Sequence, residues 1–226
     1  MIYGLNITFK KIKIMSSEFK NKKINKYAFT AATTVAIVST TSPISPTTGA
    51  VSTITKTAHG LKTGDVVSVV TGTTLPTGLA ADTAYYVYKV DDNSFKLATT
   101  WALAIASTPN VAITSQGTGT QTFRKNGYGV CHTGIFLPDN ALITLATTNP
   151  LVNFASTAAT ISITCNAQDI KTATAYNNGA WTAITNHIST TPLYLTAEAE
   201  VLITIAGGAT GALTAGTYDL WIEYNI

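Results

Sequence analysis

The amino-acid sequence predicts an all-β protein, built as a sandwich or a barrel. Threonine accounts for 42 of the 226 residues, and this β-branched residue favours pleated strands over helices. Only 11% of the residues are charged, whereas 46% are hydrophobic, so the chain can build a core and lacks the composition of a disordered protein. Alternating segments recur about every 8–12 residues between turn signals, which is typical of sandwiches and barrels.

Charge is distributed unevenly along the chain. Residues 1–26 carry seven lysines and one acid, for a net charge of +6, whereas the remaining residues carry seven basic and ten acidic groups, for −3. We interpret residues 1–26 as a basic N-terminal arm, and the favoured interpretation is a solvated tail, or extra residues upstream of a true start at Met15. The alternative is an arm that contacts nucleic acid or the acidic face of a neighbouring subunit. Interspersed lysines argue against a signal peptide, and the absence of about 18 consecutive apolar residues argues against membrane insertion.

The first predicted elements are an extended segment and a linker. Tyr27–Val38 alternates and is rich in β-branched residues. Ser39–Gly49 follows and contains Pro43 and Pro46, which cannot donate hydrogen bonds to a strand ladder. This composition predicts a connection between two parts of the fold.

A compact set of short strands is predicted next. The strands are Val51–Lys56, Asp65–Thr71, Ala84–Val90, Phe95–Thr99, Val111–Thr114 and Gln121–Phe123. The turn at 91–94 (DDNS) closes a hairpin, because Asp and Asn tolerate left-handed backbone geometry. One turn of helix is expected at Trp101–Ala106.

A second set of strands follows Arg124. Its members are Tyr128–Phe136, Ala141–Ala146, Thr160–Cys165, Val201–Ala206 and Thr217–Tyr224. In Thr160–Cys165 isoleucine and cysteine alternate with threonine and serine, so one face of that strand should be buried and the other exposed.

Residues about 50–123 contain three motifs in order: AHGLKTGDVVSVV, LPTGLAADTAYYVYKVDDNSFKLATT and GTGTQTF. They carry the elements H-G-L-x-x-G-D, Y-Y-V and D-x-x-x-F-x-L-A over about a third of the chain. This arrangement resembles a small β-barrel module that is common in phage virion proteins and similar to the FCCH domain of ubiquitin-activating enzymes. The resemblance implies a fold and no ubiquitin chemistry, because none of that enzyme's catalytic apparatus is present.

Three further segments, FLPDNALI, DIKTATAY and ALTAGTYDLWIEY, carry a second resemblance. They resemble a β-sandwich of tailed-bacteriophage virion structural proteins of the head-decoration or head-fibre kind. The resemblance implies a jelly-roll-like β-sandwich that is discontinuous, formed by residues 27–42 and 124–226. Residues 43–123 then form an inserted small β-barrel, whose chain ends lie close together as an insertion requires.

The histidines and cysteines are the first candidates for catalysis, and none has the spacing of a known site. We expect His59 to cap the backbone of the HGL turn. His132 follows Cys131 on a strand, where consecutive side chains point to opposite faces, so the two should not form a dyad. A pair between Cys131 and His187 needs tertiary proximity that the sequence does not indicate. Cys131 and Cys165 are expected to be small buried hydrophobes, reduced rather than joined as a disulfide.

Acidic clusters are also expected to be structural. Asp91, Asp92 and Asn93 form a tight turn in this interpretation, because a calcium loop needs about six or more oxygen ligands. Glu198 and Glu200 share one face of an extended segment, and we expect a solvated strand face rather than a paired-carboxylate glycosidase.

Glycine-rich and aromatic segments give no stronger signal. GTGTQ and AGGATGAL lack a following helix and are therefore poor phosphate sites. The aromatic residues Tyr85, Tyr86, Tyr88, Trp221 and Tyr224 are expected to pack in the core and across strands rather than to form a stacking platform. The sequence thus predicts no catalytic, metal-binding or cofactor-binding residue.

The two resemblances imply a non-enzymatic virion structural protein, assembled in the cytoplasm of a bacterial host. The expected role is a capsid decoration or head-fibre protein that binds the major capsid protein; the alternative is a tail or neck component, an adhesin that binds host-surface glycans. Further virion proteins and copies of the same chain are expected partners, with a trimer as one arrangement. Nucleic-acid binding is expected only of the basic arm. The sequence does not decide between a head and a tail location. It also leaves open the host, the oligomeric order and whether residues 1–14 are genuine.

Overall fold

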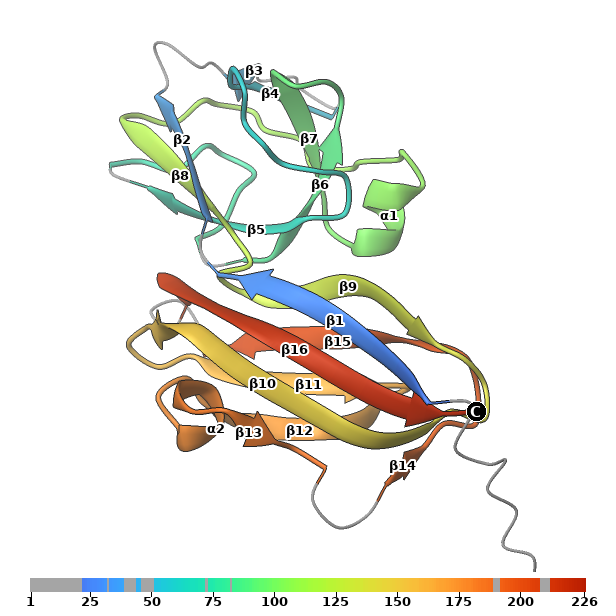
Figure 1. Cartoon of the computed structure of the whole chain (residues 1–226). Coiled ribbons are helices and arrows are strands. Elements are labelled where there is room, and N and C mark those ends of the chain that lie inside the picture. Colours follow the sequence, from blue (N-terminus) through green and yellow to red (C-terminus); the bar gives the residue numbers. More distant parts are fainter. Residues whose placement is uncertain are drawn as a thin grey trace, which may run out of the picture.

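The structure is a computed structural model that describes residues 22–31, 33–38, 44–45, 51–71, 73–81, 83–188, 192–207 and 212–226. Strands predominate in these residues and form three antiparallel sheets, which confirms the all-β prediction. Two sheets face each other at one end of the molecule, and the third curls into a half-barrel at the other end (Figure 1). We call these parts the two-sheet region (described residues of 22–31 and 126–226) and the curled-sheet region (described residues of 33–125).

The first sheet of the two-sheet region has the order β1-β16-β10-β13, with β14 also paired to β10. Its strands are β1 (Lys23–Thr30), β10 (Leu142–Ala155), β13 (Thr185–Asn186), β14 (Leu193–Tyr194) and β16 (Ala215–Asn225). The two long strands β10 and β16 run antiparallel along most of their lengths, with three register shifts, one of which directly follows Pro150. The first strand of the chain is thereby fixed to the last, because β1 pairs with β16 over eight residues.

The second sheet has the order β12-β11-β15-β9. Its strands are β9 (Gly129–Leu137), β11 (Thr160–Cys165), β12 (Gln168–Ala175) and β15 (Ala199–Ala206). In β11 the isoleucines and the cysteine are buried and the hydroxyl-bearing residues are half-exposed, so the predicted alternation is confirmed.

Large aromatic side chains fill the space between these two sheets. Phe29 stacks on Tyr218 with ring centroids 5.1 Å apart, and Phe154 meets the Tyr218 ring edge-on at 5.5 Å. Trp181, on the short helix α2 (Gly179–Thr182), lies 6.3 Å from Phe154 and is 1% exposed. Burying rings of this size contributes a large apolar contact area between the sheets.

The curled sheet has the order β2-β8-β5-β6-β7-β4-β3. Its strands are β2 (Thr33–Val38), β3 (Ile44–Ser45), β4 (Thr53–Thr55), β5 (Val66–Thr71), β6 (Tyr85–Lys89), β7 (Ser94–Ala98) and β8 (Thr120–Lys125). The sheet encloses a separate core in which Ile37, Ile54, Phe95 and Phe123 are fully buried. The helix α1 (Trp101–Ile105) begins after Thr100, whose hydroxyl accepts a hydrogen bond from Leu103 N–H, and it confirms the predicted helical turn.

Polar side chains hold the loops between these short strands. Ser52 Oγ donates to Ile113 O at 3.0 Å and accepts from Ile113 N–H at 2.8 Å. The Gln121 amide donates to the carbonyls of Thr74 and Thr118 at 2.9 and 3.0 Å. Backbone N–H and C=O groups that have no partner in a neighbouring strand therefore form hydrogen bonds with buried side chains.

The predicted boundary between the two parts of the chain is wrong in two places. Residues 33–38 were assigned to the sandwich, but β2 pairs with β8 in the curled sheet. Residues 23–26 were assigned to the basic arm, but they belong to β1, where Lys26 pairs with Asp219 at 2.7 Å. Alternation predicts that a segment is a strand and not which sheet it joins. Residues 1–21 and most of the predicted linker lie outside the described residues.

Other differences concern weakly patterned segments. The predicted strand at Val111–Thr114 is irregular, because Ser52 satisfies the backbone of Ile113 in place of a neighbouring strand. Strand β12 was not predicted, since Ile170 is the only buried residue in it. Neither described helix is long and apolar enough to cross a lipid bilayer.

Candidate functional site at the junction of the two regions

The chain passes between the two regions at two neighbouring places. The β1–β2 connection and the β8–β9 connection lie side by side, because Thr33 pairs with Lys125 and the Asn126 side-chain amide donates to Thr30 O at 3.0 Å. Asn126 N–H also donates to Val66 O at 2.9 Å. Asn126 adopts a left-handed backbone conformation with φ of 55°, which asparagine tolerates better than most residues. This residue therefore ties both connections and β5 together.

The two regions pack closely at Gly129, the first residue of β9. A Cβ atom at this position would lie 2.6 Å from Ala84 Cβ and 3.0 Å from Val66 Cγ2, and the backbone φ is +98°. Both the contact and the dihedral angle require glycine. Two hollows at the junction share Gly64, Asp65 and His132 in their walls.

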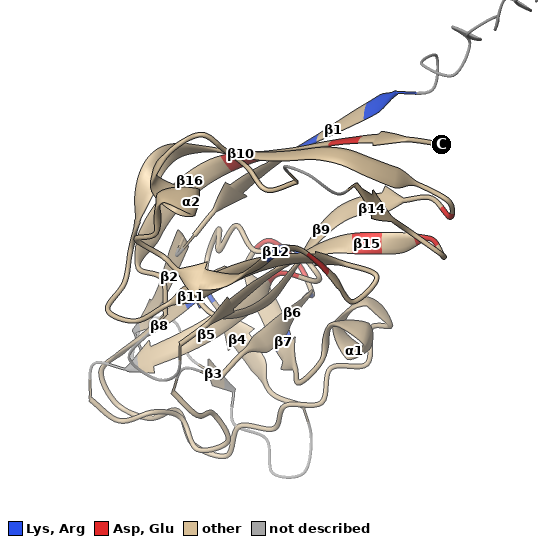
Figure 2. Ribbon diagram, turned by 90° about the horizontal axis from the view of Figure 1, so that it is seen from below, with Lys and Arg blue, Asp and Glu red and all other residues tan. Residues whose placement is uncertain are grey.

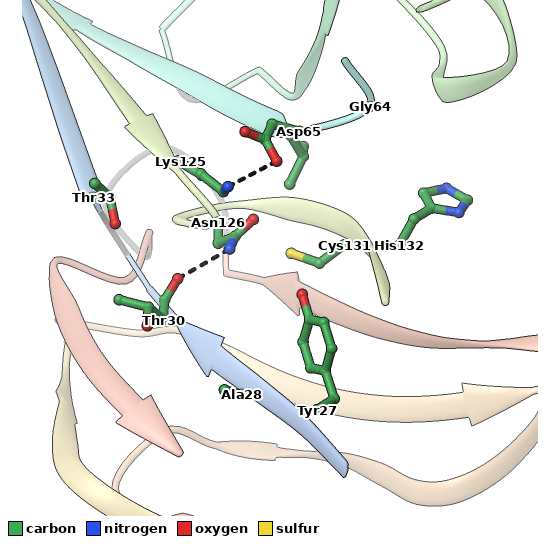
Figure 3. Close-up of a pocket in the computed structure, with 11 residues that line it drawn as sticks. Tyr27, Ala28, Thr30, Thr33, Gly64, Asp65, Lys125, Asn126, Cys131 and His132 are labelled. Carbon is green, nitrogen blue, oxygen red and sulfur yellow. Dashed lines mark hydrogen bonds and ion pairs between the residues drawn. The ribbon is translucent and has the colours of Figure 1, made fainter. Parts of the chain in front are cut away.

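The first hollow, the junction cavity, has a volume of about 200 Å³. Residues of both regions line it: Tyr27, Ala28, Thr30, Thr33, Gly64, Asp65, Val66, Lys125, Asn126, Cys131 and His132 (Figure 3). Lys125 Nζ pairs with Asp65 Oδ1 at 2.8 Å across this space. The Asp65 Oδ2 atom accepts a hydrogen bond from Lys62 N–H at 2.7 Å, so the carboxylate is fully engaged.

Two titratable groups in the junction cavity are held in their neutral forms. Burial, together with the nearby Cys131, Asp65 and Glu200, raises the pKa of Tyr27 to about 12. Burial also raises the pKa of the Cys131 thiol far above its usual range, and Lys125 only partly opposes this. A buried neutral thiol is a poor nucleophile, so Cys131 acts here as a small apolar side chain, as predicted.

The second hollow, the junction groove, has a volume of about 280 Å³ and opens beside α1. It is lined by Lys62, Thr63, Gly64, Asp65, Trp101, His132, Thr133, Gly134, Phe136 and Glu200. Trp101 stacks almost parallel on His132, with ring centroids 4.1 Å apart and an angle of 11° between the rings. His132 Nδ1 in turn lies 2.8 Å from Glu200 Oε2. This stack joins α1 of the curled-sheet region to β9 and β15 of the two-sheet region.

A β-bulge in β9 shapes the wall of the junction groove. His132 is opposite Leu202 and Phe136 is opposite Glu200, so β9 has two extra residues between these pairs. Glu200 Oε1 accepts a hydrogen bond from Gly134 N–H at 2.7 Å, and Thr133 Oγ1 donates to Val201 O at 2.7 Å. Bulges of this kind direct side chains at functional sites.

The other two histidines lie away from the junction. His59 Nδ1 accepts a hydrogen bond from Leu61 N–H at 3.0 Å, and its Nε2 lies 2.9 Å from Asp91 O, so the predicted backbone-capping role is confirmed. His187 Nε2 lies 2.9 Å from Thr148 Oγ1. Burial and the nearby Lys171 lower the pKa of His187 to about 4, so the ring is neutral at physiological pH.

Figure 3 shows the His132 ring directed away from the Cys131 thiol. This orientation agrees with the expectation that neighbouring strand residues point to opposite faces. Both cysteines are buried and are not joined to each other. Burial raises the pKa of Cys165 to about 11.

The acidic clusters also form backbone contacts. Asp91 Oδ1 accepts a hydrogen bond from Asn93 N–H, as the predicted tight turn requires, and Lys89 pairs with Asp92. Glu198 is exposed, whereas Glu200 is engaged with His132 and the bulge, so the two carboxylates do not share one environment. No group of three or more potential metal ligands occurs within the residues described above.

The predicted aromatic packing is confirmed for Tyr85, Tyr86 and Tyr224, which are all buried. Trp221 differs, because it is 39% exposed and lies under the Lys26 ammonium at 4.9 Å. The sequence analysis missed Trp101 and Phe136, whose neighbours in the groove come from distant segments. One local signal was present, since Gly134 within a strand pattern indicates a bulge.

Compared with known proteins, the chain matches no family model and no curated sequence. The junction is therefore interpreted from its own geometry.

Proposed function

We propose that the chain is a non-enzymatic structural protein of a tailed-bacteriophage particle, bound to the major capsid protein as a decoration or head-fibre component. The observation that carries this proposal is the resemblance of residues 50–123, and of three segments of the second strand set, to modules of phage virion proteins. The proposed location is the virion, after assembly in the host cytoplasm.

The sparse charge of the surface supports a role in protein–protein contact. Figure 2 shows charged positions only at scattered places on the ribbon, in keeping with 25 charged residues in the whole chain, 14 basic and 11 acidic. On β11 and β15 the outward, half-exposed positions include Thr160, Ser162, Thr164 and Thr204. Hydroxyl groups can pair with a partner's backbone without the desolvation cost of a buried charge. Such a surface suits repeated contacts between subunits.

Quantitative mass spectrometry of purified phage particles tests this proposal. The amount of this chain is measured against the amount of major capsid protein in the same particles. A near-stoichiometric ratio supports decoration of the head. Absence of the chain from the particles contradicts a virion role. A ratio of a few per cent or less favours the alternative, a tail or neck component that binds host glycans.

We also propose that the two facing sheets form a jelly-roll-like sandwich that is interrupted by an FCCH-like barrel. The observed pairing of β2 with β8 moves the expected insertion limits from 43–123 to about 32–125. Replacing residues 32–125 by a short glycine linker should therefore leave a soluble, β-rich two-sheet region, because the two connections are already adjacent at Thr30 and Asn126. Far-ultraviolet circular dichroism measures the strand content of the shortened protein, and a cooperative thermal transition shows that it is folded. An aggregated or unfolded product from a chain whose intact form folds would contradict the proposed division.

A further inference from the structure

We propose that the junction groove binds one pyranose ring of a glycan, with Phe136 as the stacking surface and His132 and Lys62 as its polar contacts. The inference concerns a ligand site and does not depend on attachment to a capsid. It rests on three features of the groove: exposed aromatic surface, uncommitted polar atoms and a fixed shape.

Phe136 provides the apolar surface. Its side chain is 53% exposed on β9 although phenylalanine is normally buried. The bulge places Phe136 in the wall of the junction groove beside His132 and Glu200. A pyranose ring has a face of C–H groups that can cover an aromatic ring, while its hydroxyl groups stay at the rim. Covering this exposed ring removes apolar surface from water, which favours binding.

His132 provides a polar contact beside this surface. Its Nδ1 atom is engaged by Glu200 at 2.8 Å, and no residue of the described ranges hydrogen-bonds to Nε2. The neutral ring with a proton on Nδ1 can accept a hydroxyl hydrogen bond at Nε2, and the charged ring can donate there. Either form matches a sugar hydroxyl group, which is both donor and acceptor.

The carboxylates around the junction groove are engaged by other groups of the protein. Asp65 pairs with Lys125, and Glu200 accepts hydrogen bonds from His132 and from the backbone of Gly134. Lys62 is exposed, and no carboxylate of the described residues lies within ion-pair distance of it. Lys62 can therefore donate to ring or hydroxyl oxygens, and it favours a pyranose that carries a carboxylate over a neutral one.

Contacts within the protein hold the walls of the junction groove in place. Trp101 stacks on His132 at 4.1 Å, and the bulge hydrogen bonds hold Gly134 and Thr133. A Cβ atom on Gly64 would lie 3.0 Å from Trp101 Nε1, so glycine at that position lets the indole ring sit against the loop. A site that needs no rearrangement loses less free energy on binding.

The size and charge of the groove favour a single sugar ring over larger ligands. Its volume of about 280 Å³ lies just below the range of about 300–1,000 Å³ that holds drug-sized molecules. A nucleotide phosphate needs clustered basic groups, whereas Lys62 is the only unpaired cation among the residues that line the groove.

Saturation-transfer difference NMR on the full-length chain tests the proposal. The probes are methyl glucoside, methyl galactoside, methyl N-acetylglucosaminide and methyl glucuronide, with the open-chain polyol sorbitol as a matched control. We expect at least one pyranoside to receive saturation at C–H groups of one ring face, and sorbitol to receive none. Affinity for the best probe should fall about tenfold in Phe136→Ala, because the stacking surface is lost.

A second variant and a matched control separate this site from other surfaces. His132→Asn keeps a donor near Glu200 and removes the Nε2 contact, and it should weaken binding about threefold to tenfold. Trp221→Ala removes an exposed aromatic ring elsewhere and should leave the affinity unchanged. The proposal is overturned if no pyranoside binds, if sorbitol binds equally well, or if Trp221→Ala weakens binding as much as Phe136→Ala does.

Discussion

The two regions of the molecule reach the same all-β architecture by different means. In the two-sheet region, β10 and β16 have 14 and 11 residues, and large aromatic rings fill the space between the sheets. In the curled-sheet region β4 has only three residues, and long loops depend on the buried polar side chains of Ser52, His59 and Gln121.

This difference indicates which substitutions each region tolerates. Long strands satisfy their own backbone groups, so the two-sheet region should depend mainly on apolar contact area. Short strands leave loop amides and carbonyls to side chains, so the curled-sheet region should be sensitive to loss of single polar groups. The following substitutions test that contrast, beginning with the largest expected effect.

Phe29→Ala should destabilise the protein most. The ring is 1% exposed and packs against Phe154 and Tyr218. Removing it leaves a cavity that costs about 3–5 kcal/mol in the free energy of unfolding, measured by denaturant titration. Ile24→Ala on the same strand is the control, because Ile24 is 57% exposed and its truncation should cost less than about 0.5 kcal/mol. Equal losses in the two variants would show that the aromatic core does not dominate this region.

His59→Ala should have the second largest effect on stability, because it removes hydrogen bonds rather than apolar contacts. The substitution leaves the buried Leu61 N–H and the carbonyl of Asp91 without their side-chain partner. Each buried group left without a partner costs about 1–3 kcal/mol, so we expect the free energy of unfolding to fall by roughly 2–4 kcal/mol in total. Native-state hydrogen exchange should show faster exchange of the Leu61 amide. Unchanged exchange at Leu61 would contradict the capping role.

Two serines of the curled-sheet region form a matched pair with a smaller expected effect. Ser52→Ala removes both hydrogen bonds to the Ile113 backbone and should cost about 1–3 kcal/mol. Ser68 is equally buried, but its hydroxyl has no hydrogen-bond partner within the described part of the chain. Ser68→Ala should therefore be neutral or stabilising. Thermal denaturation of both variants measures this, and similar losses in both would contradict the proposed dependence on polar pairing.

Acidification should weaken the two-sheet region slightly through His187. The pKa of His187 is about 4 in the folded state, whereas that of an unperturbed histidine is 6.5. The unfolded chain therefore binds the proton first as the pH falls from 6.5 towards 4, and the free energy of unfolding decreases over that interval. Allowing for partial exposure of the ring, we expect a loss of about 1 kcal/mol near about pH 5. His187→Gln should flatten this part of the pH profile of stability, and an unchanged slope would contradict the assignment.

The sequence predicted strands best where apolar and polar residues alternate strictly. Strand β11 was predicted with its observed limits, and β15 and β16 were predicted to within two residues at each end. Strand β12 was missed because Thr, Ala and Lys dominate it and only Ile170 is buried. The turn of helix expected at Trp101–Ala106 is present as α1, and the structure adds Thr100 as its N-cap residue.

The candidate site could not be predicted, because its residues meet only through the tertiary fold. His132 and Glu200 are 68 residues apart in the chain, and Trp101 comes from the other region. Each residue alone has an ordinary strand or helix context. Local patterns identify elements and turns, whereas the stack and the junction groove arise from how the two regions pack.

The paired connections between the regions also have a mechanical consequence. Two adjacent covalent links, tied by the Asn126 amide to Thr30 O, resist twisting and allow bending about the line that joins them. The Trp101–His132 stack is a further contact between the two regions. Both rings line the junction groove, so any movement that parts α1 from β9 also changes the shape of the groove.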